Sequence, residues 1–187
     1  TINGQGDTPD PSTGKTWVDC MREIAHQLPS CGNVSRPHLI LLYMGKNLTI
    51  SNVSIEDSPN WTLHIANFSD IHIHDIQIHN LQGYNRDGID IDSSQNALVE
   101  NSVVDAGDDA LCVKSGEDWV GRHNAVMAEN ITFRNIQVGT GHGITIGSDM
   151  SAGVRNVTFE NITMDGTGMI SVRLCTAVLV ARSRCSC

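Results

Sequence analysis

The stretch Asn130–Val138, which reads NITFRNIQV, sets a pattern that four other stretches of the chain follow. Each stretch begins with Asn or Asp, carries Asn or Asp again five residues later, and alternates apolar residues in between. The other four are Asn47–Ile55 (NLTISNVSI), Asp70–Ile78 (DIHIHDIQI), Asn96–Val104 (NALVENSVV) and Asn156–Met164 (NVTFENITM). Alternation with a period of two is typical of a strand with one buried face. The central Asn or Asp indicates a bend.

The starts of these stretches are 23, 26, 34 and 26 residues apart. A repeat of this length fits one coil of a solenoid and is too short for a propeller blade. Helical periodicity is absent after about residue 30, which disfavours a leucine-rich horseshoe, and we expect a short helix only within Trp17–Leu28. The sequence therefore predicts an all-β fold, a parallel β-helix with coils about 4.8 Å apart.

Eight asparagines stand in Asn-x-Ser/Thr sequons. They are Asn33, Asn47, Asn52, Asn60, Asn67, Asn130, Asn156 and Asn161. Two roles can explain these asparagines, glycosylation and side-chain stacking. Glycans at some of them would fit a secreted glycoprotein. At the bends, stacked asparagines of successive coils would instead form side-chain amide ladders, and we favour ladders there.

The composition excludes several classes of partner. The formal net charge of −9 disfavours nucleic acid and anionic membrane as partners. The chain has no apolar run of about 20 residues and no signal peptide. Cys20 and Cys31 are close enough to form a surface disulfide in a secreted protein, whereas Cys112 is expected to be a buried free thiol. Because no cysteine pair has CxxC spacing, we expect no zinc site. We also expect the protein to be a monomer.

Acidic residues recur at matching distances from the repeat starts. Asp108 lies 12 residues after Asn96, with Asp109 next to it, and His142 lies 12 residues after Asn130. Asp87 follows the start of its own repeat by 17 residues. Loops of a solenoid that keep their phase lie on one side of the molecule. We therefore expect these residues on three successive coils, about 5–10 Å apart.

Carboxyl groups this close cannot all ionise at their ordinary pKa, so at least one is expected to stay protonated near neutral pH. A protonated acid beside ionised carboxylates is what hydrolysis of a glycosidic bond requires. The pair Asp108–Asp109 also fits a polar turn or a calcium site. Spacing alone leaves all three interpretations open.

At these residues the sequence resembles glycoside hydrolase family 28, the polygalacturonases and their relatives, from about Thr1 to Met169. The motifs that carry the resemblance are Asn85–Asp90 (NRDGID), Gly107–Gly116 (GDDALCVKSG) and Gly141–Gly143 (GHG). The resemblance implies a right-handed, pectin-lyase-like β-helix, with residues 1–169 forming the central coils of one domain truncated at both ends. Lys-Ser-Gly followed by Glu117–Trp119 is closer to exo-acting members of the family.

The resemblance also implies an activity, namely hydrolysis of α-1,4-galacturonosyl linkages in pectin with inversion, by a secreted, extracellular enzyme of plant cell wall degradation that needs no cofactor or metal. Asp108 would be the general acid, and Asp87 and Asp109 would together activate water. His142 would tune the acid.

Substrate binding is implied for four further residues. Asn85 would shape the site, and Lys114 would contact a substrate carboxylate, although a solvated lysine fits as well. Arg86 and Arg173 are further cations that would offset the charge of a polyanionic substrate.

The sequence departs from the family pattern in two places. Arg86 replaces a small threonine, which we expect to place a long cation in the site. Arg173 is not followed by the lysine of the family's Arg-x-Lys motif, and the repeat stops at Ile170. We therefore predict an aberrant tail over residues 170–187, with a frameshift as one hypothesis.

These departures keep alternatives open. One is a catalytically inactive or carbohydrate-binding β-helix, and another is a calcium-dependent lyase. A rhamnogalacturonan hydrolase is a third, against which Asn85 and His142 argue.

Overall fold

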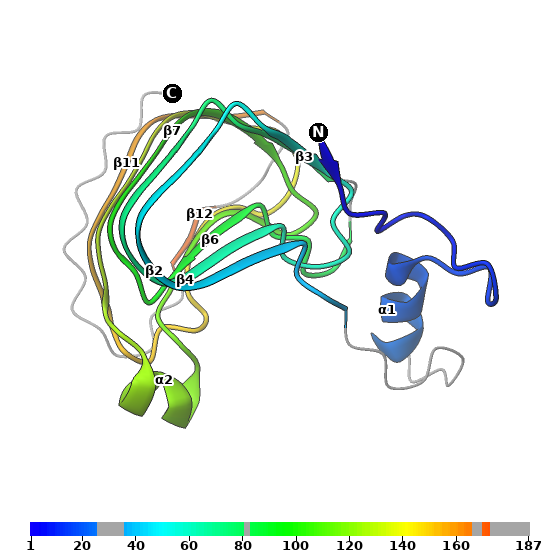
Figure 1. Ribbon diagram of the computed structural model, residues 1–187, viewed down its shortest axis with the longest axis horizontal. Helices are drawn as coiled ribbons and strands as arrows, with labels where there is room; N and C mark the ends of the chain where they lie inside the picture. Colours follow the sequence, from blue (N-terminus) through cyan, green and yellow to red (C-terminus); the bar gives the residue numbers. More distant parts are fainter. Residues whose placement is uncertain (26–35, 81–82, 166–169, 173–187) are drawn as a thin grey trace.

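A computed structural model describes residues 1–25, 36–80, 83–165 and 170–172 (Figure 1). Its elements are β1 (Ile2–Asn3), α1 (Trp17–Ala25), β2 (Ile40–Ser51), β3 (Ser54–Glu56), β4 (Leu63–His74), β5 (Gln77–His79), β6 (Ile89–Asp92), β7 (Gln95–Asp105), β8 (Asp109–Lys114), α2 (Asp118–Asn124), β9 (Ala128–Val138), β10 (Gly143–Ile146), β11 (Val154–Met164) and β12 (Ile170–Val172). The described strand pairs are all parallel. They wind into a parallel β-helix of about 5 turns, as predicted.

The five repeats stack on one another in the predicted register. The first runs from β2 into β3, the second from β4 into β5, and the other three lie in β7, β9 and β11. β2, β4, β7, β9 and β11 run side by side along the outer wall of the coil in Figure 1. The second residues of the repeats pair in one row, namely Leu48, Ile71, Ala97, Ile131 and Val157. Each coil therefore repeats the path of the one before it.

The asparagines and aspartates of the repeats adopt the left-handed backbone conformation, with φ between 50° and 60°. Asn and Asp tolerate this conformation better than other side chains with a Cβ. The amide of Asn130 donates to Asn96, 3.1 Å away, and accepts from Asn156, 2.6 Å away. A second ladder joins Asn161 to Asn135. Bends and amide ladders are thus confirmed.

Apolar side chains of successive coils stack inside the solenoid. In the row of Ile73, Val99 and Phe133 the side chains are fully buried, and Phe133 stacks on Phe159 with ring centroids 5.2 Å apart. Each such side chain removed from water stabilises the fold by about 1.5–3 kcal/mol. The alternation seen in the sequence is therefore the alternation between this core and the surface.

The prediction of a single short helix was only partly correct. α1 starts at Trp17 as expected, capped by reciprocal hydrogen bonds between Thr16 and Asp19. The prediction that no helix follows was wrong, because α2 lies between β8 and β9 and fills the longest repeat spacing. A helix of 7 residues is too short to show a helical period in the sequence.

The structure describes three residues of the predicted tail, which form β12. β12 pairs with β10 through Ile144 and Ile170, so the coil continues into the predicted tail. Residues 173–187, with the rest of that tail, lie outside the described residues.

Two of the cysteine predictions can be compared with the structure. Cys112 is buried and free, as expected. Cys20 takes part in a disulfide, while Cys31 lies outside the described residues. Neither helix of the described part is long and apolar enough to cross a membrane.

Asn130 sits in the middle of a ladder and provides a test of it. Replacing Asn130 with Ala should cost about 1–2 kcal/mol of unfolding free energy, because the left-handed backbone is strained with a Cβ and two amide hydrogen bonds are lost. Asn130→Gly relieves the strain and should cost less. Urea denaturation of both variants measures this; equal losses would show that backbone conformation plays no part.

Candidate active site

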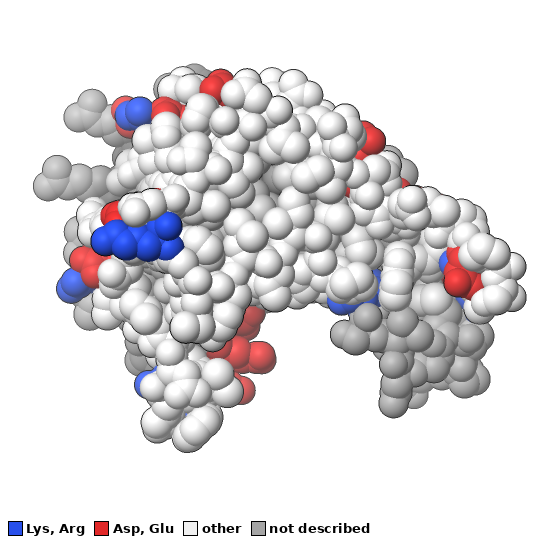
Figure 2. All heavy atoms as spheres, viewed as in Figure 1, with Lys and Arg blue, Asp and Glu red and all other residues white. Residues whose placement is uncertain are grey.

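One face of the solenoid carries a cleft, beneath the sheet formed by β6, β8 and β10. The loops that enter these strands bring Asp87, the Asp108–Asp109 pair and His142 to the same side on successive coils. The cleft measures about 350 Å³ and is lined by Trp61, Asn85, Asp87, Asp108, Asp109, Lys114, His142, Thr145, Ser148 and Asp149. On the underside, acidic side chains gather beside α2 in the hollow of the surface (Figure 2).

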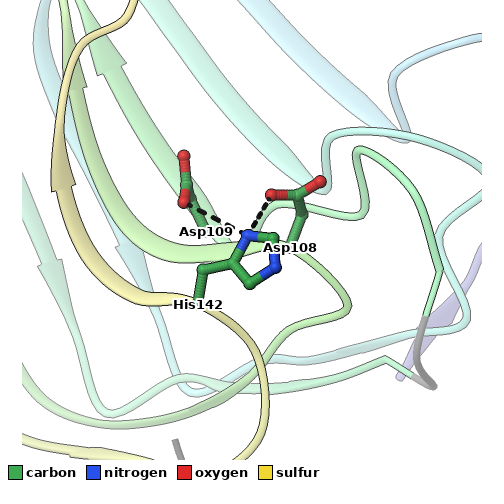
Figure 3. Close-up of side chains that lie close together, drawn as sticks. All are labelled: Asp108, Asp109 and His142. Atoms are coloured by element: carbon green, nitrogen blue, oxygen red, sulfur yellow. Dashed lines mark ion pairs between the residues drawn. The ribbon is translucent and has the colours of Figure 1, made fainter. Parts of the chain in front are cut away.

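Two carboxylates converge on one imidazole at the mouth of the cleft. Nδ1 of His142 lies 2.7 Å from Oδ1 of Asp108 and 3.8 Å from Oδ1 of Asp109 (Figure 3). All three side chains reach solvent, with 58% of His142 and about a fifth of each carboxylate exposed. The group can therefore exchange protons with a bound molecule.

The backbone around His142 fixes this arrangement. The N–H of His142 donates to the carbonyl oxygen of Asp108, 2.7 Å away. Gly141 has a φ of 113°, and a Cβ there would lie 2.5 Å from the same carbonyl oxygen. The hydroxyl of Thr145, on β10, donates to Asp109 over 2.7 Å. The loop and the strand thus orient both carboxylates from one neighbouring coil.

Asn85 holds the other oxygen of Asp108. Its backbone N–H donates to Oδ2 of Asp108 over 2.9 Å. Its side-chain oxygen accepts a hydrogen bond from Arg36, which also donates to the carbonyl oxygens of Tyr84 and Pro59. Asn85 therefore acts on Asp108 through its backbone, and Arg36 secures the loop that carries it.

A second group of charges lies below the cleft. Asp87 is 3% exposed, Asp90 is fully buried, and Lys114 lies between them. Burial raises the pKa of Asp87, the charge of Asp90 adds to the rise, and Lys114 opposes it. Burial also raises the pKa of Asp90. A raised carboxyl pKa was expected, but its main cause is burial and not the repulsion on which the prediction rested.

The expectation that Arg86 places a cation in the site is not supported. Its side chain is fully buried and forms ion pairs with Asp7 and Asp57, at 3.0 and 2.9 Å. Its Nε donates to the carbonyl oxygen of Ser58. Arg86 therefore turns away from the cleft, which the neighbouring Asp87 lines. Lys114 does line the cleft but is 4% exposed, which excludes a solvated lysine.

Sequence reasoning missed several residues of the site. Trp61 and Thr145 line the cleft, and Arg36 holds Asn85. Thr145 could have been found, since it stands two residues after Gly143 on the outward phase of a strand. Trp61 and Arg36 precede the motif-bearing coils and gave no signal. Arg173 lies outside the described residues.

The fold and the site define a β-helical protein with a glycosidase-like cluster of acidic groups. The sequence matches the glycosyl hydrolases family 28 over residues 1–181, beyond the point at which we expected the resemblance to end. The chain belongs to this family.

Its relatives carry the name polygalacturonase. The chain is 32% identical to an endo-polygalacturonase of Pectobacterium carotovorum subsp. carotovorum over 89% of its length and 39% of the relative's. The structure of the polygalacturonase from Erwinia carotovora ssp. carotovora superposes with a TM-score of 0.78 at 30% identity, over 89% of this chain and 42% of that one. An exopolygalacturonase from Thermotoga maritima gives 0.67 at 35% identity, covering 78% and 35%. The chain therefore spans about two fifths of these relatives.

The backbone conformation of Gly141 allows its loop to approach the carbonyl oxygen of Asp108 closely. Gly141→Ala should lower the unfolding free energy by more than about 2 kcal/mol, because the methyl group meets the Asp108 carbonyl in a backbone region that favours glycine. Gly14 also has a positive φ but has open space around its Cα, so Gly14→Ala is the matched control. Thermal unfolding of the two variants should differ; equal losses would contradict the close contact.

Proposed function

We propose that this chain forms catalytic coils of a pectin hydrolase that cleaves α-1,4-galacturonosyl linkages in polygalacturonate. The observation that carries the proposal is the convergence of Asp108 and Asp109 on His142, with buried Asp87 lining the same cleft. Glycoside hydrolysis uses one carboxyl group as an acid and another to activate water. The names of the relatives support the substrate class.

Asp108 is assigned the role of general acid. It is accessible to a leaving-group oxygen, and Nδ1 of His142, 2.7 Å away, can hold or return its proton. Asp109, oriented by Thr145, takes up the proton of the attacking water together with Asp87. The groups thus divide into an acid, Asp108, at the mouth of the cleft and a base formed by Asp109 beside it and the buried Asp87.

The proposed enzyme is a secreted monomer that acts on the pectin of plant cell walls and requires no cofactor. An acidic chain with sequons and a disulfide-bonded Cys20 fits an extracellular setting. Glycans are proposed at sequons outside the ladders. Size-exclusion chromatography and the mass change after enzymatic deglycosylation test these two points.

Replacement of Asp108 tests the assignment. Asp108→Asn should lower kcat on polygalacturonate about 10²–10⁴-fold with little change in stability, because the amide cannot donate the proton. Glu160→Gln, which neutralises an exposed carboxylate on β11, should leave activity unchanged. The assay is release of reducing ends from polygalacturonate. Retained activity of Asp108→Asn would rule out this residue as the acid.

The products of the unsubstituted chain decide between the alternatives. A hydrolase releases reducing ends without the absorbance of an unsaturated uronate. Unsaturated products that disappear on chelation of calcium would indicate a lyase. Cleavage of rhamnogalacturonan but not of polygalacturonate would indicate a rhamnogalacturonan hydrolase. A folded sample that binds oligogalacturonides without cleaving them would indicate a binding protein.

The stereochemical course is a separate prediction, inversion at the anomeric carbon. It rests on membership of the family. One oxygen each of Asp108 and Asp109 and a ring nitrogen of His142 lie within 4.8 Å of one another, closer than the roughly 6.5–9.5 Å usual between the carboxyl groups of inverting enzymes. Proton NMR during the first minutes of hydrolysis should show the β-anomer first; initial formation of the α-anomer would establish retention.

A further inference from the structure

Lys114 occupies an enclosed position at the end of β8. Its Nζ lies 3.8 Å from Oδ2 of Asp87, 3.6 Å from Oδ1 of Asp90 and 3.5 Å from the carbonyl oxygen of Gly147. The ring of Trp61 covers the ammonium at 4.5 Å from its centroid. With three oxygen neighbours and an aromatic face around it, the group has no side left for a substrate carboxylate.

We propose that Lys114 is a positioning residue that favours the ionised form of Asp87 in its role as part of the base, and that it does not bind the substrate. This inference rests on the proposed hydrolase function. It replaces the substrate contact that the sequence suggested for Lys114.

The count of charges supports the proposal. Oδ1 of Asp87 and both oxygens of Asp90 are buried and accept no hydrogen bond from the described residues. A buried carboxylate without donors is strongly destabilised, so only a nearby positive charge allows one of the two to ionise. One ammonium between two carboxyls leaves the pair with one proton to share. Burial raises the pKa of Asp87 to about 10 and that of Asp90 to about 7. Asp87 can therefore act on a water in the cleft only after the shared proton has moved to Asp90, which is fully buried.

The titratable groups that face Asp87, Asp90 and Lys114 are Asp108, Asp109, His64, Cys112 and Arg36. Among the described residues, Lys114 forms an ion pair with both carboxyls, whereas Arg36 donates to the carbonyl oxygens of Tyr84 and Pro59. Burial raises the pKa of the Cys112 thiol, which is therefore neutral at working pH. Burial lowers the pKa of Lys114, whereas Cys112, Asp90 and Asp87 raise it, and the net direction is upward. Because Cys112 is a neutral thiol, the carboxyls of Asp90 and Asp87 are the neighbours that keep the ammonium charged.

The test uses two substitutions with opposite expected effects. Lys114→Met removes the cation and should move the acidic limb of the pH profile of kcat/KM upward by about 1–3 pH units. Asp90→Asn removes the competing carboxyl and should move that limb downward. KM for an oligogalacturonide should change less than threefold in both variants, and Lys114→Arg should restore most of the Lys114→Met shift. A large rise in KM of Lys114→Met with an unmoved pH profile would overturn the proposal and make Lys114 a substrate ligand.

A measurement without substrate keeps the inference separate from the activity. Carboxyls with a raised folded-state pKa contribute stability below their ordinary pKa near 4, and this stability is lost as the pH rises through the folded-state value. The thermal midpoint should therefore fall more between pH 5 and pH 8 in Lys114→Met than in the unsubstituted chain, and less in Asp90→Asn. If the chain proves inactive, only the hydrolase function fails. If Lys114→Met does not fold, Asp90→Asn alone tests the proposal. A thermal midpoint with the same pH dependence in Asp90→Asn and in the unsubstituted chain would show that Asp87 and Asp90 do not share a proton.

Discussion

In-register stacking of parallel coils is the constraint on which the rest of this molecule depends. Because β4, β6, β8 and β10 pair strand by strand, the loops that enter them lie one above another. Asp87, the Asp108–Asp109 pair and His142 are distant in sequence and become neighbours through this stacking alone. The left-handed bends at Asn and Asp keep the path of each coil constant, so a single bend out of register would separate the acid from the base.

Two buried cations, Arg86 and Lys114, pair with carboxylates on the two sides of one loop. Arg86 pairs with Asp7 and Asp57 and fastens the N-terminal segment to the solenoid. Lys114 lies between Asp87 and Asp90 under the cleft. Two adjacent residues, Arg86 and Asp87, thus belong to different charge clusters, one concerned with holding the fold together and the other with chemistry. Removing either cation would leave uncompensated charges in the interior.

Patterns that recur along the chain were predictable, and features that occur once were not. The repeats gave the strands, the bends and the ladders, because alternation and Asn spacing act locally and recur coil after coil. α2 was missed because its 7 residues carry no period, and β12 pairs with β10 although its residues depart from the repeat. Arg86 was assigned to the site because it stands beside Asp87, whereas its side chain turns to Asp7 and Asp57.

The amino-acid sequence by itself determined the coil, its register and the set of residues that share a face, since these follow from periodicity and from the backbone preference of Asn and Asp. It also determined that several acidic groups would crowd together. Only the tertiary structure decided which carboxyls are buried and which cation each one meets. Burial depends on how neighbouring coils close over a side chain, and that closure placed Lys114 between Asp87 and Asp90 and left Asp108 and Asp109 open beside His142.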